Sequence, residues 1–344
     1  MYNYSLQSIN RFKVLALLVC LLGMVLLSSC SQDDSIAMPQ KDQMEGGKRP
    51  LILKANLKSK WNNNSRQQRI SRGTPTNFFY ETFGLFGAAY NAGDAVNMTM
   101  NYMYNEECDE GMDVWQTVLP YSMPEISKQM TFFAYYPYQG TTVNKEYIFF
   151  NGGNADKVGE PYFDFIIPDS VLLQPDLMVA RTEMLSDNLI NGDTIKLKFK
   201  HLLTAVRFTV DASVPKGRIK SISIDNVVSG GTYTYENDSF VPHDTIRTYK
   251  LNTDIVTTGS SAVSLSDNQA FLMMPQYLTE NSSVTIVFDN GRSYRLKKTL
   301  EEVVWEPGKI VTYNIKITSL KELILTTTIE PWEVGTTFNW NSSY

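Results

Sequence analysis

The chain has 344 residues, of which 36 are acidic and 31 are basic, so its net charge is −5 at neutral pH. This balance excludes the strongly basic surface of a nucleic-acid-binding protein. The length suggests two domains, each large enough to bury a hydrophobic core. Only two histidines and three cysteines are present, which limits the metal and disulfide chemistry of the chain.

The first segment reads as an export signal. Arg11 and Lys13 form a positive region, and residues 14–27 form an uncharged, mostly apolar run. A run of this length suits the core of a signal peptide but is shorter than the roughly 20 residues that a membrane-spanning helix needs. We therefore expect residues 1–29 to be a signal peptide.

The end of this signal resembles a bacterial lipobox, with the sequence Leu27-Ser28-Ser29-Cys30. The cut in a lipobox precedes a cysteine that takes up a diacylglyceryl group, because a thiolate is the required nucleophile. Several acyl chains then give a durable anchor. The alternative is an ordinary secretory signal in which Cys30 is incidental. The next residues, 31–34 (SQDD), look like the acidic signal that sends lipoproteins of Bacteroidota to the outer face of the outer membrane.

A tether and one strand follow the signal. Residues 30–48 are polar, contain Pro39 and show no apolar periodicity, so we expect a flexible tether. Apolar residues that alternate with more polar ones after Ile52 come next, which predicts a half-buried strand. Its apolar positions are Leu51, Leu53, Ala55 and Leu57.

Residues 59–76 predict an exposed loop. They are polar and basic and contain Gly73 and Pro75. Exposed polar loops are preferred sites of proteolysis, and three arginines in this loop are candidate cleavage sites. The alternative is a solvated basic loop without a function. The candidates are Arg66, Arg69 and Arg72.

The region from residue 78 predicts an all-β fold. Short apolar and aromatic runs are separated by Gly, Pro, Asn and Asp, and helical periodicity is nearly absent, which indicates a sandwich or barrel. The segment 176–181 fits either a strand or a short helical turn. Domains are expected at residues 49–187 and 188–344. The runs are residues 83–89, 96–104, 114–118, 129–136 and 147–150.

The predicted second domain contains clearer strands. The inward face of residues 194–210 changes parity near Leu202, which predicts a bulge or bend there. Asn290-Gly291 between two alternating segments predicts a hairpin. Residues 311–317 alternate again, and a last apolar segment, 323–332, precedes a short aromatic tail.

Five motifs together give the chain a family resemblance. It resembles the fimbrillin-like (Mfa-like) family of outer-surface pilus and adhesin subunits in Bacteroidota, and the order and spacing of the motifs cover most of the chain after the signal. Those motifs are residues 131–137 (TFFAYYP), 175–180 (PDLMVA), 199–208 (FKHLLTAVRF), 271–276 (FLMMPQ) and 305–309 (WEPGK), followed by Tyr313.

The resemblance implies two tandem transthyretin-like β-sandwich domains and assembly by strand exchange. In pilus-forming members a trypsin-like protease cuts after an arginine that follows the first strand, and a strand from another subunit fills the groove left behind. Here the displaced strand would carry Leu51, Leu53, Ala55 and Leu57, and the cut would follow Arg66, Arg69 or Arg72. The donor strand would carry Leu323, Leu325, Ile329 and Trp332.

The implied protein is a non-enzymatic surface lipoprotein without a cofactor, which serves as a fimbrial subunit or an adhesin. Its expected partners are other fimbrial subunits in a homopolymer or heteropolymer, the outer membrane through a lipid on Cys30, and a host or bacterial surface ligand. The expected location is the outer face of the outer membrane, or the fimbrium after polymerisation.

Enzymes and metal proteins are disfavoured by the absence of their motifs. The chain lacks the metalloprotease, hydrolase, phosphate-loop and dinucleotide-binding patterns. We expect His201 to be a structural, hydrogen-bonded residue and Cys108 to be buried or incidental. The acidic run 106–110 lacks the order of a calcium loop, so a solvated loop is preferred to a metal site. Whether scattered carboxylates form a glycosidase pair depends on their separation in space.

A surface glycan-binding module is the alternative function. Exposed Trp or Tyr rings would then stack on sugars. The five tryptophans are too dispersed to nominate such a platform, and we expect them to pack in the core or at strand ends. They are Trp61, Trp115, Trp305, Trp332 and Trp340.

Overall fold

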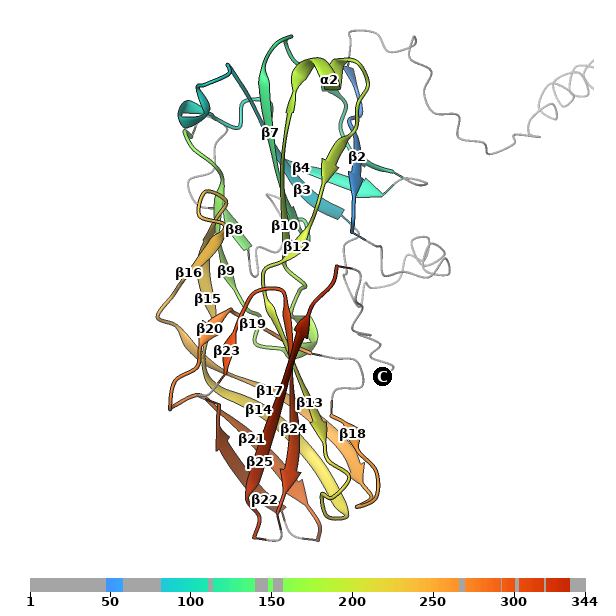
Figure 1. The fold of residues 1–344 in the computed structure, drawn as a ribbon, viewed down its shortest axis with the longest axis vertical. Coiled ribbons are helices and arrows are strands. Elements are labelled where there is room, and N and C mark those ends of the chain that lie inside the picture. The colour runs from blue at the N-terminus through green and yellow to red at the C-terminus, as the bar shows by residue number, and fades with distance from the viewer. Residues whose placement is uncertain are drawn as a thin grey trace, which may run out of the picture. The chain divides into compact units, whose positions relative to one another are not determined.

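The structure is a computed structural model. It describes residues 48–57, 82–110, 114–139, 148–150, 157–265, 270–291, 293–300, 303–318 and 320–334. All of them belong to a compact unit that begins at Gly46. Strands dominate this part of the chain, which confirms the predicted all-β fold (Figure 1).

The largest sheet has eight strands in the order β11-β2-β5-β4-β3-β7-β10-β12. Its central strands β3, β4, β7 and β10 are antiparallel and form a continuous ladder. Their bounds are Thr82–Tyr90, Met103–Glu110, Gln129–Tyr136 and Met178–Leu185. The shorter strands are β2 (Ile52–Ala55), β5 (Trp115–Thr117), β11 (Ile195–Leu197) and β12 (Lys200–His201).

A four-stranded sheet packs against one face of the central strands. Its order is β16-β15-β9-β8. Tyr135 on β7 contacts Phe163 on β9, and Phe133 contacts Tyr235 just after β15, with ring centroids 6.3 and 5.1 Å apart. The bounds are β8 Ile148–Phe150, β9 Tyr162–Ile166, β15 Gly230–Thr234 and β16 Ser239–Pro242.

Two further sheets form a sandwich around a shared core. One has the order β18-β13-β24-β25, with β19 also paired to β13. Its strands are β13 Thr204–Val210, β18 Val263–Ser264, β19 Phe271–Met273, β24 Lys309–Ile317 and β25 Leu323–Pro331. The other has the order β17-β14-β21-β22. Its strands are β14 Gly217–Val228, β17 Ile246–Thr257, β21 Ser283–Asp289 and β22 Ser293–Thr299.

The remaining elements are short. β1 (Lys48–Arg49) pairs with β6 (Tyr121–Ser122), and β20 (Gln276–Tyr277) pairs with β23 (Val304–Trp305). The helical elements are α2 (Ser186–Ile190) and the 3-10 turns η2 (Ala95–Asn97) and η3 (Val171–Leu173).

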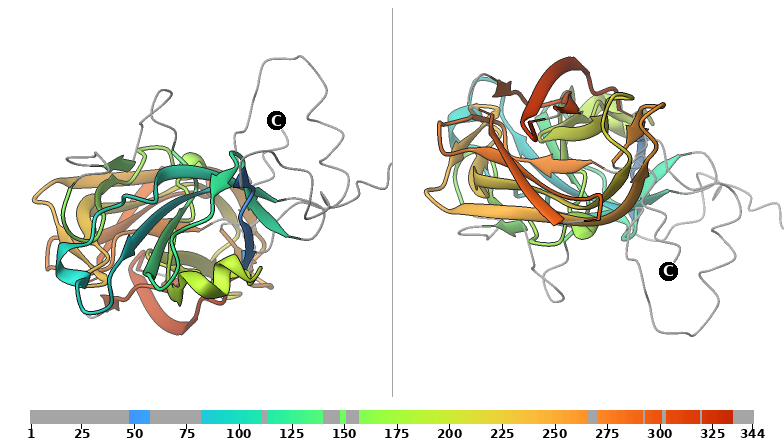
Figure 2. Two further views of the ribbon diagram at one scale, coloured as in Figure 1. Left: turned by 90° about the horizontal axis from the view of Figure 1, so that it is seen from above. Right: turned by 90° about the horizontal axis from the view of Figure 1, so that it is seen from below.

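Buried side chains gather in two clusters. The larger runs from one face of β3 and β7 through β9 and β15 into the C-terminal sandwich. The smaller lies on the other face of the eight-stranded sheet, where Phe83 contacts both Trp115 and Phe199. β11 also approaches β10. The sheet therefore curls around the smaller cluster, and β2, drawn in blue in Figure 2, lies between β5 and the edge strand β11.

Many of the predicted strands are present, but some predictions were wrong. The predicted strand at 96–104 is wrong except for its last two residues, because η2 occupies Ala95–Asn97 and β4 begins only at Met103. The acidic run 106–110 is not a loop but lies within β4. The ambiguous segment 176–181 enters a strand, β10.

The parity change near Leu202 marks a change of sheet. His201 ends β12 in the eight-stranded sheet, and Thr204 begins β13 in the sandwich. β11 and β12 therefore follow the expected domain boundary at 187/188 and still pair with β2 and β10. The division into two domains stays a prediction.

Candidate functional site

The first feature of interest is the groove between β5 and β11 that holds β2, which we call the seat of β2. This strand runs antiparallel to β5, with Ile52 opposite Gln116, and parallel to β11, with Leu53 opposite Ile195. Leu51 extends the pairing, because its N–H donates to Thr117 Oγ1 at 3.1 Å and its carbonyl accepts from Thr117 N at 3.3 Å. β2 thus separates two strands that would otherwise leave an open groove.

Side chains of β2 fill this seat in the predicted alternation. Leu51, Leu53 and Leu57 are 1%, 0% and 7% exposed, and Ala55 is half-buried. They belong to the smaller core cluster together with Trp115, Ile195 and Phe199. Removing β2 would expose the apolar walls of the groove to water, which makes the seat a strong apolar binding site for a replacement strand.

A polar clamp at the end of β2 escaped the sequence analysis. The side chain of Asn56 donates from Nδ2 to the carbonyl of Phe199 at 3.2 Å and accepts from its N–H at 2.7 Å. An amide is the side chain that can copy one rung of a strand ladder in this way. Its only sequence signal is a polar residue in the alternating segment, which does not identify the partner.

Arg49 holds the other end of the segment. Its guanidinium donates to the carbonyls of Leu189 and Ile190 at 3.1 and 3.4 Å, where α2 ends. A cation is favoured at this end of a helix, where the carbonyls carry partial negative charge. The segment 48–57 is therefore fastened at both ends.

The predicted processing sites lie outside the described residues. Arg66, Arg69 and Arg72 lie in the connection between Leu57 and Thr82, and Cys30 lies in the N-terminal segment. Their lipidation and cleavage therefore stay predictions.

The candidate donor segment forms β25. It pairs antiparallel with β24 along its whole length, from Leu323 opposite Ile317 to Pro331 opposite Lys309. Among the described strands, β24 is its partner in the sheet, so β25 is an edge strand (Figure 1). Leu323 is buried and Leu325 is half-buried, but Ile324 and Ile329 are 45% and 54% exposed.

Trp332 fastens the end of β25. Its side chain is 4% exposed and lies flat on the ring of His201, with centroids 3.9 Å apart and planes inclined by 8°. The backbone N–H of Trp332 donates to the carbonyl of Gly308 at 2.8 Å. Behind it, Nδ1 of His201 lies 2.7 Å from Oδ1 of Asp176. The prediction that His201 is a structural, hydrogen-bonded histidine is confirmed.

The motifs behind the family resemblance meet around this contact. Gly308 N donates to the carbonyl of Leu203, and Thr204 Oγ1 donates to the carbonyl of Glu306 at 2.7 Å. Trp305 Nε1 donates to the hydroxyl of Tyr313 at 3.1 Å. Burial raises the pKa of Tyr313 to about 12, so this hydroxyl stays neutral. The motifs therefore build the packed region that holds Trp332, at the C-terminal end of β25. We call this region the junction.

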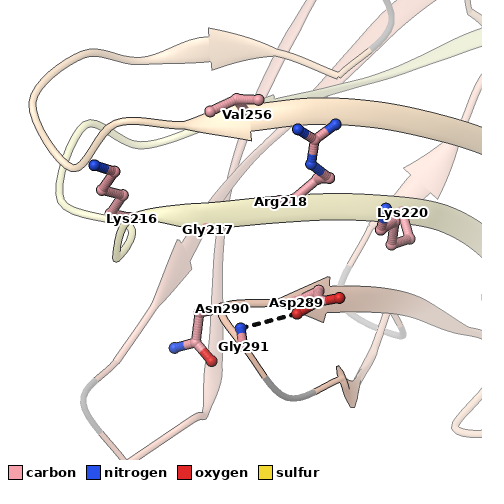
Figure 3. Close-up of a pocket in the computed structure, with 8 residues that line it drawn as sticks. All are labelled: Lys216, Gly217, Arg218, Lys220, Val256, Asp289, Asn290 and Gly291. Atoms are coloured by element: carbon pink, nitrogen blue, oxygen red, sulfur yellow. Dashed lines mark hydrogen bonds between the residues drawn. The ribbon is translucent and has the colours of Figure 1, made fainter.

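A shallow hollow of about 460 Å³ lies on the outer side of β14. Figure 3 shows Lys216, Arg218 and Lys220 along one side and the turn from Asp289 to Gly291 along the other. Gly291 N donates to Asp289 Oδ1 at 2.9 Å and shapes this turn, where Gly291 adopts a φ of 103°. Arg218 and Lys220 both pair with Asp254, which partly neutralises the cationic side of the hollow, and Lys216 lies beside them.

Other candidate residues are structural where they are described. Cys108 is buried, as expected, and burial raises its thiol pKa well above the ordinary value, helped by nearby carboxylates. Trp115, Trp305 and Trp332 are buried and offer no exposed ring. Within the described ranges, no group of three or more His, Cys, Asp or Glu side chains is arranged to hold a metal ion.

The same part of the chain contains no helix long and apolar enough to cross a membrane.

These features define an all-β protein of packed sheets in which β2 lies in an apolar groove between β5 and β11 and β25 is an edge strand. The model of the Fimbrillin-like family matches residues 81–332. The chain belongs to this family, which confirms the resemblance drawn from the motifs.

Individual relatives agree with this assignment. The fimbrium subunit Fim1C of Phocaeicola vulgatus is 25% identical over 222 residues, which cover 54% of this chain and 57% of that protein. A fimbrial protein from Bacteroides vulgatus has a TM-score of 0.61 at 19% identity, over 83% of this chain and 100% of that one. A protein assigned to cell adhesion from Bacteroides uniformis reaches 0.55 at 15% identity, over 85% and 100%. At these identities the two structures show a shared fold.

Proposed function

We propose that this chain is a non-enzymatic cell-surface lipoprotein that serves as a structural subunit of a fimbria or as an adhesin. Its family membership supports this function, and its relatives include a fimbrium subunit and a fimbrial protein. The structural roles of His201 and Cys108 agree with a protein that works by assembly. Other fimbrial subunits, in a homopolymer or heteropolymer, are the proposed partners, and a host or bacterial surface molecule is the proposed ligand.

The seat of β2 is the observation that carries the proposed assembly mechanism. A cut after Arg66, Arg69 or Arg72 would separate β2 from the rest of the chain, and its ladder contacts to β5 and β11 are short. Its departure would leave a groove lined by Trp115 and Ile195. Strand addition into this groove would restore both the ladder and the buried apolar surface.

We propose that β25 of another subunit is the added strand, carrying Leu323, Leu325, Ile329 and Trp332. An edge strand with exposed apolar side chains is available for pairing with another chain. Because β25 is already paired with β24, donation requires that this ladder opens and that Trp332 leaves His201.

We propose that a lipid on Cys30 holds the precursor at the outer face of the outer membrane. The lipobox-like sequence at residues 27–30 supports this anchor. Cleavage in the loop of residues 59–76, the arginine loop, would release the body from its lipidated N-terminus, since both Cys30 and β2 precede the cut.

Limited trypsin digestion of a chain that begins at Ser31 tests the mechanism. The expected result is cleavage confined to the arginine loop, loss of residues 48–57 from the body and appearance of SDS-resistant ladders. The matched control replaces Arg66, Arg69 and Arg72 with Gln, together with Lys58 and Lys60, the other trypsin sites that follow β2 in this loop. It should keep β2 joined to the body and stay monomeric. A cleaved chain that stays monomeric and retains residues 48–57 would refute strand exchange.

The hollow in Figure 3 favours a second candidate function, the binding of surface glycans. Lys216 and Asn290 could hold the carboxylate and hydroxyls of an acidic sugar, and Arg218 could join them by leaving Asp254, its partner in the structure. Binding of the monomer to a glycan array, lost in a Lys216→Ala/Arg218→Ala variant, would support this function. Equal binding by the variant would exclude the hollow.

A further inference from the structure

Two strands that lie far apart in the sequence carry the same apolar pattern. Residues 51–57 read LILKANL, and residues 323–329 read LILTTTI. The first three residues are identical, and the seventh is a branched aliphatic residue in both. The first segment contains β2 and the second begins β25.

The pattern matches what the seat of β2 requires. Positions 51, 53 and 57 point into the core and need large aliphatic side chains, whereas position 55 is held by a small, half-buried alanine. Leu323, Leu325 and Ile329 would supply the three large groups. Thr327, whose side chain is smaller than those of Leu and Ile, would fall at the position of Ala55.

Other registers fit less well. If Leu325 instead of Leu323 occupied the position of Leu51, Thr327 would lie at the site of Leu53, which is fully buried. A shift of two residues in the opposite direction would place Lys321 at the site of Leu51. A slip by one residue would place Thr326 or Glu322 in a core position, because neighbouring side chains point to opposite faces of a strand.

In its own sheet β25 buries Leu323 and half-buries Leu325 but leaves other aliphatic side chains in water. Ile329 lies opposite Val311, which is fully buried, but is itself largely exposed. Ile324, on the other face, is also exposed. Exposed aliphatic residues on both faces of an edge strand are the features that lead to pairing with another chain.

We infer that residues 323–329 of a second copy of this chain occupy the seat of β2 in one register, with Leu323 at the position of Leu51 and Ile329 at that of Leu57. The donor runs antiparallel to β5 and parallel to β11, as β2 does. This inference rests on the proposed strand exchange and adds its register. The register makes Ile324 the partner of Gln116.

Paired cysteines test the register. In the resident strand Ile52 lies directly opposite Gln116, so a cysteine at 324 of the donor should face a cysteine at 116. One chain carries Gln116→Cys and the other Ile324→Cys, both begin at Ser31, and the mixture is treated with trypsin and then a mild oxidant. The control pairs Gln116→Cys with Thr326→Cys, which lies two residues out of register. The unsubstituted chain, with its buried Cys108, gives the background.

The expected result is a covalent dimer band under non-reducing conditions for the 116/324 pair, at least tenfold stronger than for the 116/326 pair. A stronger 116/326 band would overturn the register and leave strand exchange standing. Ladders without a band from either pair would also overturn the inferred register. If the unsubstituted chain forms no ladder after cleavage, the proposed strand exchange fails before the register is tested.

Discussion

Replacement of Trp332 by alanine should open β25 without unfolding the rest of the chain. The indole is buried on the ring of His201 and anchors the C-terminal end of β25 at the junction. Side chains at 326–331 are exposed, and the described partner of β25 is β24 alone, so little else holds the C-terminal half of the strand.

The expected size of the effect follows from this burial. Truncating a buried tryptophan to alanine costs about 3–5 kcal/mol. If about 3 kcal/mol of this acts on local opening, the open population rises about a hundredfold, since 1.4 kcal/mol corresponds to a factor of ten. Trp332→Phe retains a flat ring on His201 and should raise the open population much less.

Native-state hydrogen exchange measures this opening directly. Amides that join β24 and β25 should exchange about a hundredfold faster in Trp332→Ala, whereas amides between β14 and β21 should change less. Glu330→Ala, at an exposed position of the same strand, should exchange as the parent does. Equal acceleration in all sheets would refute the reasoning, because Trp332 would then act on global stability rather than on β25.

Three other outcomes follow from the structure. Thr328→Asn should stabilise polymers against urea by about 1 kcal/mol, because in the inferred register this asparagine can repeat the two bonds of Asn56 to Phe199. Thr326→Asn, at the exposed position of Lys54, should have no such effect, and equal effects would contradict the register. Gly84→Ala should lower the free energy of unfolding by about 1–3 kcal/mol, since the added Cβ would lie 2.0 Å from Cε1 of Tyr135; an unchanged urea midpoint would contradict this. Cys108, in a chain without Cys30, should resist a thiol reagent at mildly alkaline pH until the chain is unfolded, because burial and adjacent carboxylates raise its pKa and keep the thiolate population low; rapid labelling of the folded chain would show that the strand opens.

Local alternation was the most dependable feature of the sequence. Leu51, Leu53 and Leu57 are buried as predicted, and the Asn290-Gly291 turn joins β21 to β22. The loop predicted for residues 106–110 from their acidic composition is wrong. Residues 106–110 are acidic but belong to β4, because Cys108 and Asn105 face the core and the carboxylates lie along a half-buried strand.

Long edge strands were also difficult to predict. β17 (Ile246–Thr257) was not predicted, and its solvent-facing positions dilute the apolar signal that Tyr249 and Leu251 provide. Its place in the sheet depends on β14, which it pairs with through two register shifts. Such a strand is stabilised mainly by its neighbour rather than by its own composition.

The sequence by itself determined the class of fold, the family and the segments whose alternation predicts strands. These follow from interactions between residues a few positions apart and from motifs that can be recognised in order. The tertiary structure alone decided that β2 lies between β5 and β11, that Asn56 binds Phe199, and that Trp332 lies on His201. Each of these contacts joins residues more than fifty positions apart, and strand partners at such separation are selected by packing in the folded core, which periodicity along the chain does not encode.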